Sequence, residues 1–160
     1  MFDVELYRGS KEEKYQLLFK QLAALVEDET NMIANLSNAS ALLNHFLEDV
    51  NWVGFYLVED DGLVLGPFQG LPACIRIPFG KGVCGTSAAG RRTLRVEDVH
   101  QFPGHIACDA ASQSEIVIPV VLKDGSLIGV LDIDSPIKNR FDETDQKMLE
   151  EFTEILAKHL

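Results

Sequence analysis

Three carboxylates in the second half of the chain are spaced so that a β-hairpin would gather them on one face of a sheet. The segment Lys123–Ser126 (KDGS) separates two runs rich in Val, Ile and Leu. An Asp-Gly pair between such runs predicts a two-residue hairpin turn. In that register Glu115 faces Asp134, and Asp132 lies on the same side of its strand as Asp134. The sequence therefore predicts a small patch of three acidic side chains.

This acidic patch would have apolar neighbours. The predicted register pairs Val121 with Ile128 and places both, with Val117 and Val130, on the acidic face. Facing carboxylates repel one another, so such a cluster persists where solvent screens it, a cation fills it, or one member keeps a proton. A solvated sheet face would explain the cluster in an acidic protein. The apolar neighbours favour a ligand with an ammonium group, a divalent metal, or a proton-donating acid.

Three cysteines supply a second kind of chemistry. Cys74, Cys84 and Cys108 are spaced too widely for the compact pairs of a structural zinc site, even with His105 close to the last of them. Redox chemistry fits better: one thiolate attacks, becomes a sulfenic acid, and condenses with a second thiol to a disulfide that an external reductant reopens. A helix start favours a thiolate at Cys84, whereas His105 would help Cys108 and Asp109 would oppose it. These residues alone do not choose between the cysteines, and buried inert thiols are the plain alternative.

The run Trp52–Val58 (WVGFYLV) is predicted to be a central strand. Trp52, Gly54 and Tyr56 would share one face of it. Gly54 would leave a gap between the two rings that could admit a small apolar group. An aromatic pair in a strand is more often part of the core, and the sequence favours that interpretation.

The rest of the pattern supplies elements that would position these residues. A capping box at Ser10 and Glu13 opens a predicted N-terminal helix. A second helix is expected from about Thr30 to Leu47, and a last one after a cap at Asp142. The two terminal helices would pack side by side against the sheet. Shorter elements are expected as strands from residue 63, at 74–77 and at 93–96, and as a helix at 83–89.

The composition narrows the class of protein. With 160 residues, 46% of them hydrophobic and 24% charged, the chain is expected to form one domain over residues 1–160. A net charge of -11 argues against nucleic acid and anionic membranes as partners. No apolar run reaches membrane-spanning length, and the N-terminus lacks a signal-peptide pattern. A cytoplasmic location is therefore expected, where cysteines are more often redox-active or metal-binding than structural.

Three segments of the chain closely resemble the free methionine-(R)-sulfoxide reductases. They are GPFQGLPAC (66–74), GKGVCG (80–85) and DVHQFPGHIACDAASQSEIV (98–117). The similarity extends from about Trp52 to the C-terminal helix. It implies an α+β, GAF-like fold, in which a central antiparallel sheet carries the N- and C-terminal helices on one face and a ligand pocket on the other.

The resemblance also implies roles for the cysteines. Cys108 would attack the sulfoxide sulfur of free methionine (R)-sulfoxide, and Cys84 would resolve the sulfenic acid, with Cys74 a secondary or alternative partner. Thioredoxin would reduce the resulting disulfide, and no metal or bound cofactor is implied.

The pocket residues take their expected roles from the same resemblance. Glu115, Asp132 and Asp134 would hold the ammonium of the free amino acid and supply a proton to the sulfoxide oxygen. Trp52 and Tyr56 would enclose the methylsulfinyl end. The main alternative is a non-enzymatic GAF small-molecule sensor, and a zinc-binding structural module is a third option. The sequence leaves the oligomeric state open, a homodimer included.

Overall fold

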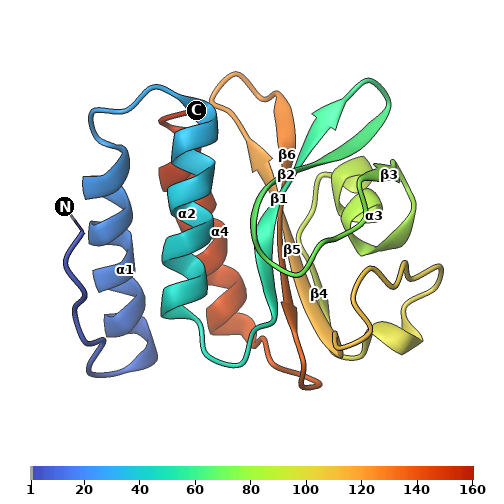
Figure 1. Cartoon of the computed structure of the whole chain (residues 1–160), viewed down its shortest axis with the longest axis horizontal. Helices are drawn as coiled ribbons and strands as arrows, with labels where there is room; N and C mark the ends of the chain where they lie inside the picture. Colours follow the sequence, from blue (N-terminus) through green and yellow to red (C-terminus); the bar gives the residue numbers. More distant parts are fainter. Residues whose placement is uncertain (1) are drawn as a thin grey trace.

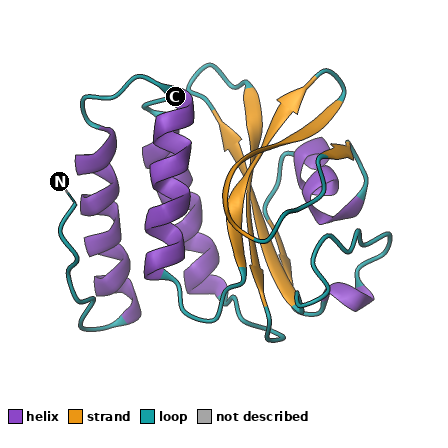
Figure 2. Cartoon of the chain, viewed as in Figure 1, coloured by secondary structure: helices purple, strands orange, loops and turns teal. Residues whose placement is uncertain are grey.

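The fold is built around one six-stranded antiparallel sheet, seen in the computed structural model of residues 2–160 (Figures 1 and 2). Its strands run in the spatial order β3-β2-β1-β6-β5-β4. The α+β, GAF-like architecture expected from the sequence is confirmed. The strands are β1 (Trp52–Glu59), β2 (Gly62–Gly70), β3 (Arg76–Pro78), β4 (Leu94–Val96), β5 (Ser114–Val121) and β6 (Leu127–Ser135).

Three long helices lie on one side of the sheet (Figure 1). They are α1 (Lys11–Val26), α2 (Met32–Phe46) and α4 (Glu143–Ala157). Helix α2 contacts β1 and β2, α4 contacts β5, and α1 packs on the outer side of α2 and α4. The terminal helices α1 and α4 do lie side by side, but α2 takes the expected place of α1 against the sheet. The sequence of α2 contains no Asp, Glu, Lys or Arg, so this helix can be covered on two sides.

The ends of the terminal helices follow from local chemistry. The Ser10 hydroxyl accepts a hydrogen bond from the backbone N–H of Glu13, and Asp142 caps α4 in the same way through the N–H of Asp145. Both starts agree with the sequence prediction. Helix α2 begins at Met32 behind an Asn31 cap, two residues later than the expected start at Thr30.

The turn of the β5–β6 hairpin differs from its prediction. The backbone N–H of Gly125 donates to the carbonyl of Leu122 (2.9 Å), and the N–H of Leu122 donates to the carbonyl of Ser126 (2.9 Å). Gly125 has a φ of +88°, in the left-handed region that glycine adopts without strain. The connection is therefore a three-residue loop whose third residue is glycine, and not a two-residue turn.

A β-bulge compensates for this longer loop. The register shifts between Val120 and Val121, so Val121 pairs with Leu127 and not with Ile128 as expected. Ile128 packs against the core on the helix side of the sheet. Because the loop and the bulge each displace the register by one residue, their effects cancel further along. Glu115 still faces Asp134, as the sequence predicts.

The sheet separates two apolar clusters. The larger lies between the sheet and the helices and includes Val53 and Phe55 of β1. The smaller lies on the opposite face and includes Trp52 and Tyr56, so the predicted alternation of β1 is confirmed. Helix α3 (Gly82–Gly90), where the sequence predicts a helix at 83–89, covers this second cluster.

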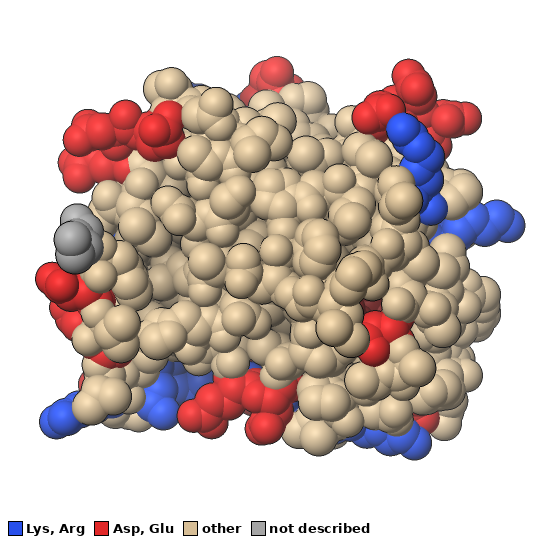
Figure 3. Space-filling view, in the orientation of Figure 1, with Lys and Arg blue, Asp and Glu red and all other residues tan. Residues whose placement is uncertain are grey.

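Charged side chains of both signs lie on the face of the molecule shown in Figure 3. Figure 3 shows acidic side chains mainly near the edges of the face in view, with uncharged surface over most of its centre. Within residues 2–160, no helix combines the length and the apolar character needed to cross a bilayer. The cytoplasmic location and the single-domain organisation stay predictions.

Candidate active site

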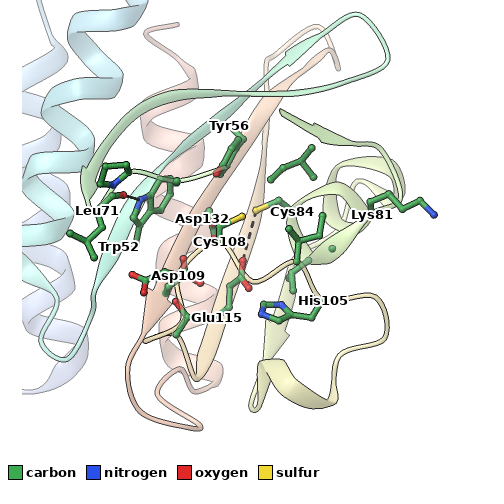
Figure 4. Close-up of a pocket in the computed structure, with 18 residues that line it drawn as sticks. Trp52, Tyr56, Leu71, Lys81, Cys84, His105, Cys108, Asp109, Glu115 and Asp132 are labelled. Carbon is green, nitrogen blue, oxygen red and sulfur yellow. Dashed lines mark hydrogen bonds between the residues drawn. The ribbon is translucent and has the colours of Figure 1, made fainter. Parts of the chain in front are cut away.

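A pocket lies on the sheet face that α2 and α4 leave free (Figure 4). Its floor comes from β1, β5 and β6, and its walls come from α3 and from loops around residues 71–73 and 105–112. The residues that line the pocket include seven of the site residues predicted from the sequence: Trp52, Tyr56, Cys84, Cys108, Glu115, Asp132 and Asp134. Cys74 does not line it but is bonded to Cys108. The fold therefore brings all the predicted site residues together.

The aromatic wall of the pocket is a stack of rings. The Trp52 ring stacks on Tyr56 at a centroid distance of 5.7 Å and on Phe68 of β2 at 5.1 Å. A Cβ at Gly54 would lie 2.3 Å from the Cβ of Phe68, so this glycine is what lets Phe68 approach. Phe68 and the Trp52 ring fill the space above Gly54, and Trp52 stacks directly on Tyr56, so the expected gap between the two rings is closed. Trp52 and Tyr56 are each 2% exposed, so they belong to the core while lining the pocket.

Polar atoms of the two rings hold the loop between β2 and β3. The Trp52 Nε1 donates to the carbonyl of Leu71 (3.1 Å), and the Tyr56 hydroxyl donates to the carbonyl of Cys74 (2.9 Å). Both bonds satisfy buried ring donors. The aromatic wall thereby positions Cys74 at the rim of the pocket.

The acidic floor is buried. Glu115 and Asp132 are each 5% exposed. Burial is the main cause that raises the pKa of Glu115, and the nearby carboxylates of Asp132 and Asp134 add to it. Burial also raises the pKa of Asp134, followed by the charges of Asp132 and Asp109. The pocket thus holds carboxyl groups that retain protons above the usual range.

One atom of this floor lacks a partner. The Oδ1 of Asp132 is buried and accepts no hydrogen bond from any group in residues 2–160. An unsatisfied buried carboxylate oxygen costs free energy that a donor or a cation in the pocket would recover. The floor is therefore suited to a positively charged ligand group.

The cysteines are arranged differently from the first expectation. Cys74 and Cys108 form a disulfide with a Cα–Cα distance of 5.4 Å, and Cys84 is free and buried. Burial raises the pKa of the Cys84 thiol, and the charges of Asp132 and Glu115 raise it further. The favourable effect of a helix start, expected for Cys84, is outweighed. The family resemblance implied Cys84 as the first partner of Cys108 and Cys74 as the alternative, but the bonded partner is Cys74. Cys84 lies deeper in the pocket, against the carboxylates.

The help expected from His105 stays a prediction. Its imidazole lines the pocket, and burial lowers its pKa, with a smaller effect from His100. Because Cys108 is in the disulfide here, it carries no thiolate that this ring could stabilise.

Sequence reasoning missed a polar clamp beside Cys108. The side-chain amide of Asn51 donates to Asp109 Oδ2 (2.9 Å) and to Ser112 Oγ (3.2 Å). This clamp ties the loop that follows Cys108 to the start of β1. The sequence offered one indication of this clamp: Asn51 and Asp109 are chain neighbours of the predicted site residues Trp52 and Cys108.

Known proteins match the chain over most of its length. Residues 30–160 match the family model of the GAF domain. The free methionine-R-sulfoxide reductase of Escherichia coli is 55% identical over 151 residues, which cover 94% of this chain and 91% of that protein. The chain belongs to this family of GAF-domain proteins.

Two further relatives show how evenly the similarity is distributed. Protein YtsP of Bacillus subtilis is 66% identical over 162 residues, covering 100% of this chain and 99% of that protein. The X-ray structure of free methionine-R-sulfoxide reductase from Neisseria meningitidis, in complex with its substrate, superposes with a TM-score of 0.93 at 46% identity. It covers 99% of this chain and 95% of that one. The similarity to these relatives therefore covers the helices as well as the pocket.

Proposed function

We propose that the protein reduces free methionine (R)-sulfoxide to methionine. The observation that carries this proposal is the placement of a cysteine pair at the rim of a pocket with a buried acidic floor. A thiol pair supplies two electrons, and the acidic floor supplies both a proton and a site for an ammonium group. The named activity of the Escherichia coli relative and the substrate complex of the Neisseria meningitidis relative support the same substrate.

The chemistry begins at Cys108. In the reduced enzyme its thiolate attacks the sulfoxide sulfur, while a protonated carboxyl of the floor donates to the sulfoxide oxygen. Glu115 is suited to this because burial raises its pKa, which keeps the acid form available at higher pH than in an exposed glutamate. Oxygen passes to the cysteine as a sulfenic acid, and methionine is released. The sulfoxide gains two electrons, which Cys108 loses.

Cys74 resolves the sulfenic acid. Its thiol attacks the sulfur of oxidised Cys108, a disulfide forms, and the oxygen leaves as water. We assign this step to Cys74 and not to Cys84, because Cys74 is already within bonding distance of Cys108. The raised pKa of the Cys84 thiol also makes it the poorer nucleophile.

Thioredoxin would then reduce the Cys74–Cys108 disulfide. Exposed apolar side chains flank Cys74, with Leu71 65% and Ile75 67% exposed. Exposed apolar groups beside a disulfide provide a contact surface for a protein reductant. A dithiol donor restores both thiols and takes up the oxidation as its own disulfide.

The acidic floor selects the free amino acid. The ammonium of free methionine sulfoxide would approach Asp132 and Asp134 and would satisfy the unpartnered Asp132 Oδ1. A methionine residue inside a peptide has no such cation. We therefore expect N-acetyl-methionine sulfoxide to be reduced with a kcat/KM about 100-fold lower, because charged hydrogen bonds of this kind contribute about 1.5–3 kcal/mol each. The methyl ester of methionine sulfoxide keeps the ammonium and is the matched control.

Thiol variants test the proposed sequence of steps. With thioredoxin, thioredoxin reductase and NADPH, Cys108→Ser should consume no NADPH on addition of free methionine (R)-sulfoxide. Cys74→Ser should release a first equivalent of methionine and then stall, while Cys84→Ser should continue to turn over. Continued turnover by Cys108→Ser would contradict the proposed function. Stalling by Cys84→Ser with full turnover by Cys74→Ser would return the resolving role to Cys84.

A further inference from the structure

Cys84 has no role in the disulfide chemistry above, yet its surroundings differ from those of an inert buried thiol. Its Sγ lies 3.8 Å from Glu115 Oε1. One ligand atom from each of Cys84, Glu115 and Asp132 falls within 4.8 Å of the others. Each of the three side chains is 5% exposed. Helix α3, strand β5 and strand β6 thus bring three potential metal ligands to one point on the pocket floor (Figure 4).

A second observation points to a ligand at this position. Asp132 is 5% exposed, and its Oδ1 is buried without a hydrogen-bond partner in the part of the chain that the structure describes. Its carboxylate belongs to the same three-residue group. An ammonium group would satisfy this oxygen but would gain nothing from the neighbouring thiol. A metal ion would use both.

The spacing is close to that of a metal centre. Bonds of about 2.3 Å to sulfur and about 2.1 Å to oxygen in a tetrahedral zinc site separate the ligand atoms by roughly 3.4–3.6 Å. The Cys84 to Glu115 distance of 3.8 Å is only slightly longer. The remaining pairs lie within 4.8 Å, so side-chain movements of about 1 Å would close the set. A thiolate with two carboxylates suits a borderline, thiophilic ion such as Zn²⁺ better than Mg²⁺ or Ca²⁺.

We propose that the pocket binds a thiophilic divalent cation of the Zn²⁺ class through Cys84, Glu115 and Asp132. The fourth coordination position faces the pocket. Because the ion takes the carboxylates that the substrate ammonium needs, bound metal and bound substrate exclude one another. The metal site stands on its own geometry, whereas this competition rests on the proposed function.

The disulfide provides a clean way to observe the site. In protein oxidised with diamide and then freed of oxidant, Cys74 and Cys108 are bonded, and Cys84 is the remaining thiol of residues 2–160. Co²⁺ serves as the spectroscopic probe, since a thiolate ligand gives an intense near-ultraviolet charge-transfer band. Titration should develop this band to a stoichiometric end point, and Zn²⁺ should abolish it by displacement. Mg²⁺ should leave it unchanged.

Variants assign the ligands. Cys84→Ala should remove the band, and Asp132→Asn, which preserves the side-chain volume, should weaken Co²⁺ binding at least 10-fold. Asp61→Asn changes an exposed carboxylate in the β1–β2 turn and is the matched control, with binding as in the parent. Circular dichroism confirms that each variant is folded. A band that survives in Cys84→Ala, or no band in the folded parent, would overturn the metal site.

Competition is measured in the same oxidised protein, where no turnover occurs. Free methionine sulfoxide should lower the intensity of the charge-transfer band in a concentration-dependent way, and N-acetyl-methionine sulfoxide should leave the intensity unchanged. A band that is indifferent to saturating free methionine sulfoxide would refute mutual exclusion. Because the readout does not involve reduction, absence of reductase activity would count against the proposed function while leaving the metal result intact.

Discussion

Reduction of the Cys74–Cys108 disulfide should lower the stability of the protein by a predictable amount. The two cysteines are 34 residues apart in the chain. For a closed loop of that length, the chain-entropy model gives a stabilisation of about 4 kcal/mol at 25 °C. In a chain of 160 residues, a change of this size shifts the melting temperature by roughly 8–15 °C.

Urea unfolding of oxidised and reduced protein measures this difference. We expect the free energy of unfolding to fall by about 4 kcal/mol when the parent is treated with a phosphine reductant. Cys84→Ala should show the same fall, because Cys84 is not part of the bond. Cys74→Ser and Cys108→Ser should show none. The variants also report which thiols pair in solution.

Two results would refute this reasoning. A reductant-dependent change that persists in Cys74→Ser and disappears in Cys84→Ala would mean that Cys108 pairs with Cys84. The free energy of unfolding of the parent could also stay the same although mass spectrometry verifies the bond. The bond would then destabilise the folded state by as much free energy as it destabilises the unfolded chain. The first outcome would remove the structural basis for assigning the resolving step to Cys74, whereas the second would refute only the chain-entropy estimate.

Further predictions concern the pocket floor, the aromatic wall and the helix layer. Burial raises the pKa of Glu115 in the folded protein. As pH rises from about 4, the Glu115 carboxyl therefore loses its proton in the unfolded chain before it does so in the folded protein. The free energy of unfolding falls with pH until the folded-state pKa is reached. Glu115→Gln should therefore lose less stability than the parent between pH 5 and pH 8 in urea titrations, and an equal loss would contradict the assignment. Gly54→Ala would place a Cβ 2.3 Å from the Cβ of Phe68, so it should destabilise the protein by about 1–3 kcal/mol in thermal melts. An unchanged melting temperature would show that β2 can shift to accommodate the methyl group without a cost in stability. The buried Tyr15 hydroxyl donates to Asp145 at 2.7 Å, so Tyr15→Phe should cost about 1.5–3 kcal/mol in denaturant unfolding, and a neutral result would argue that water replaces the bond.

Features that depend on short-range chemistry could be predicted from the sequence alone. The capping box at Ser10 and the cap at Asp142 lie where predicted, because each involves only four consecutive residues. Alternation along a strand places Asp132 and Asp134 on one face, and the facing pair Glu115 and Asp134 was predicted correctly because the longer loop and the bulge cancel. The turn prediction was wrong because the sequence KDGS is compatible with loops of two or three residues, and a bulge at Val121 absorbs the difference.

The pairing of the cysteines depends on contacts between distant parts of the chain. Their spacing in the chain does not say which two approach, because Cys74 and Cys108 lie on loops that meet only when the sheet forms. The pKa of Cys84 was likewise out of reach. A helix start favours the thiolate, but burial against Glu115 and Asp132 opposes it more strongly, and burial is a property of the packed chain. Local periodicity therefore specifies which residues face the pocket, whereas distances and desolvation inside it arise from packing between elements remote in sequence.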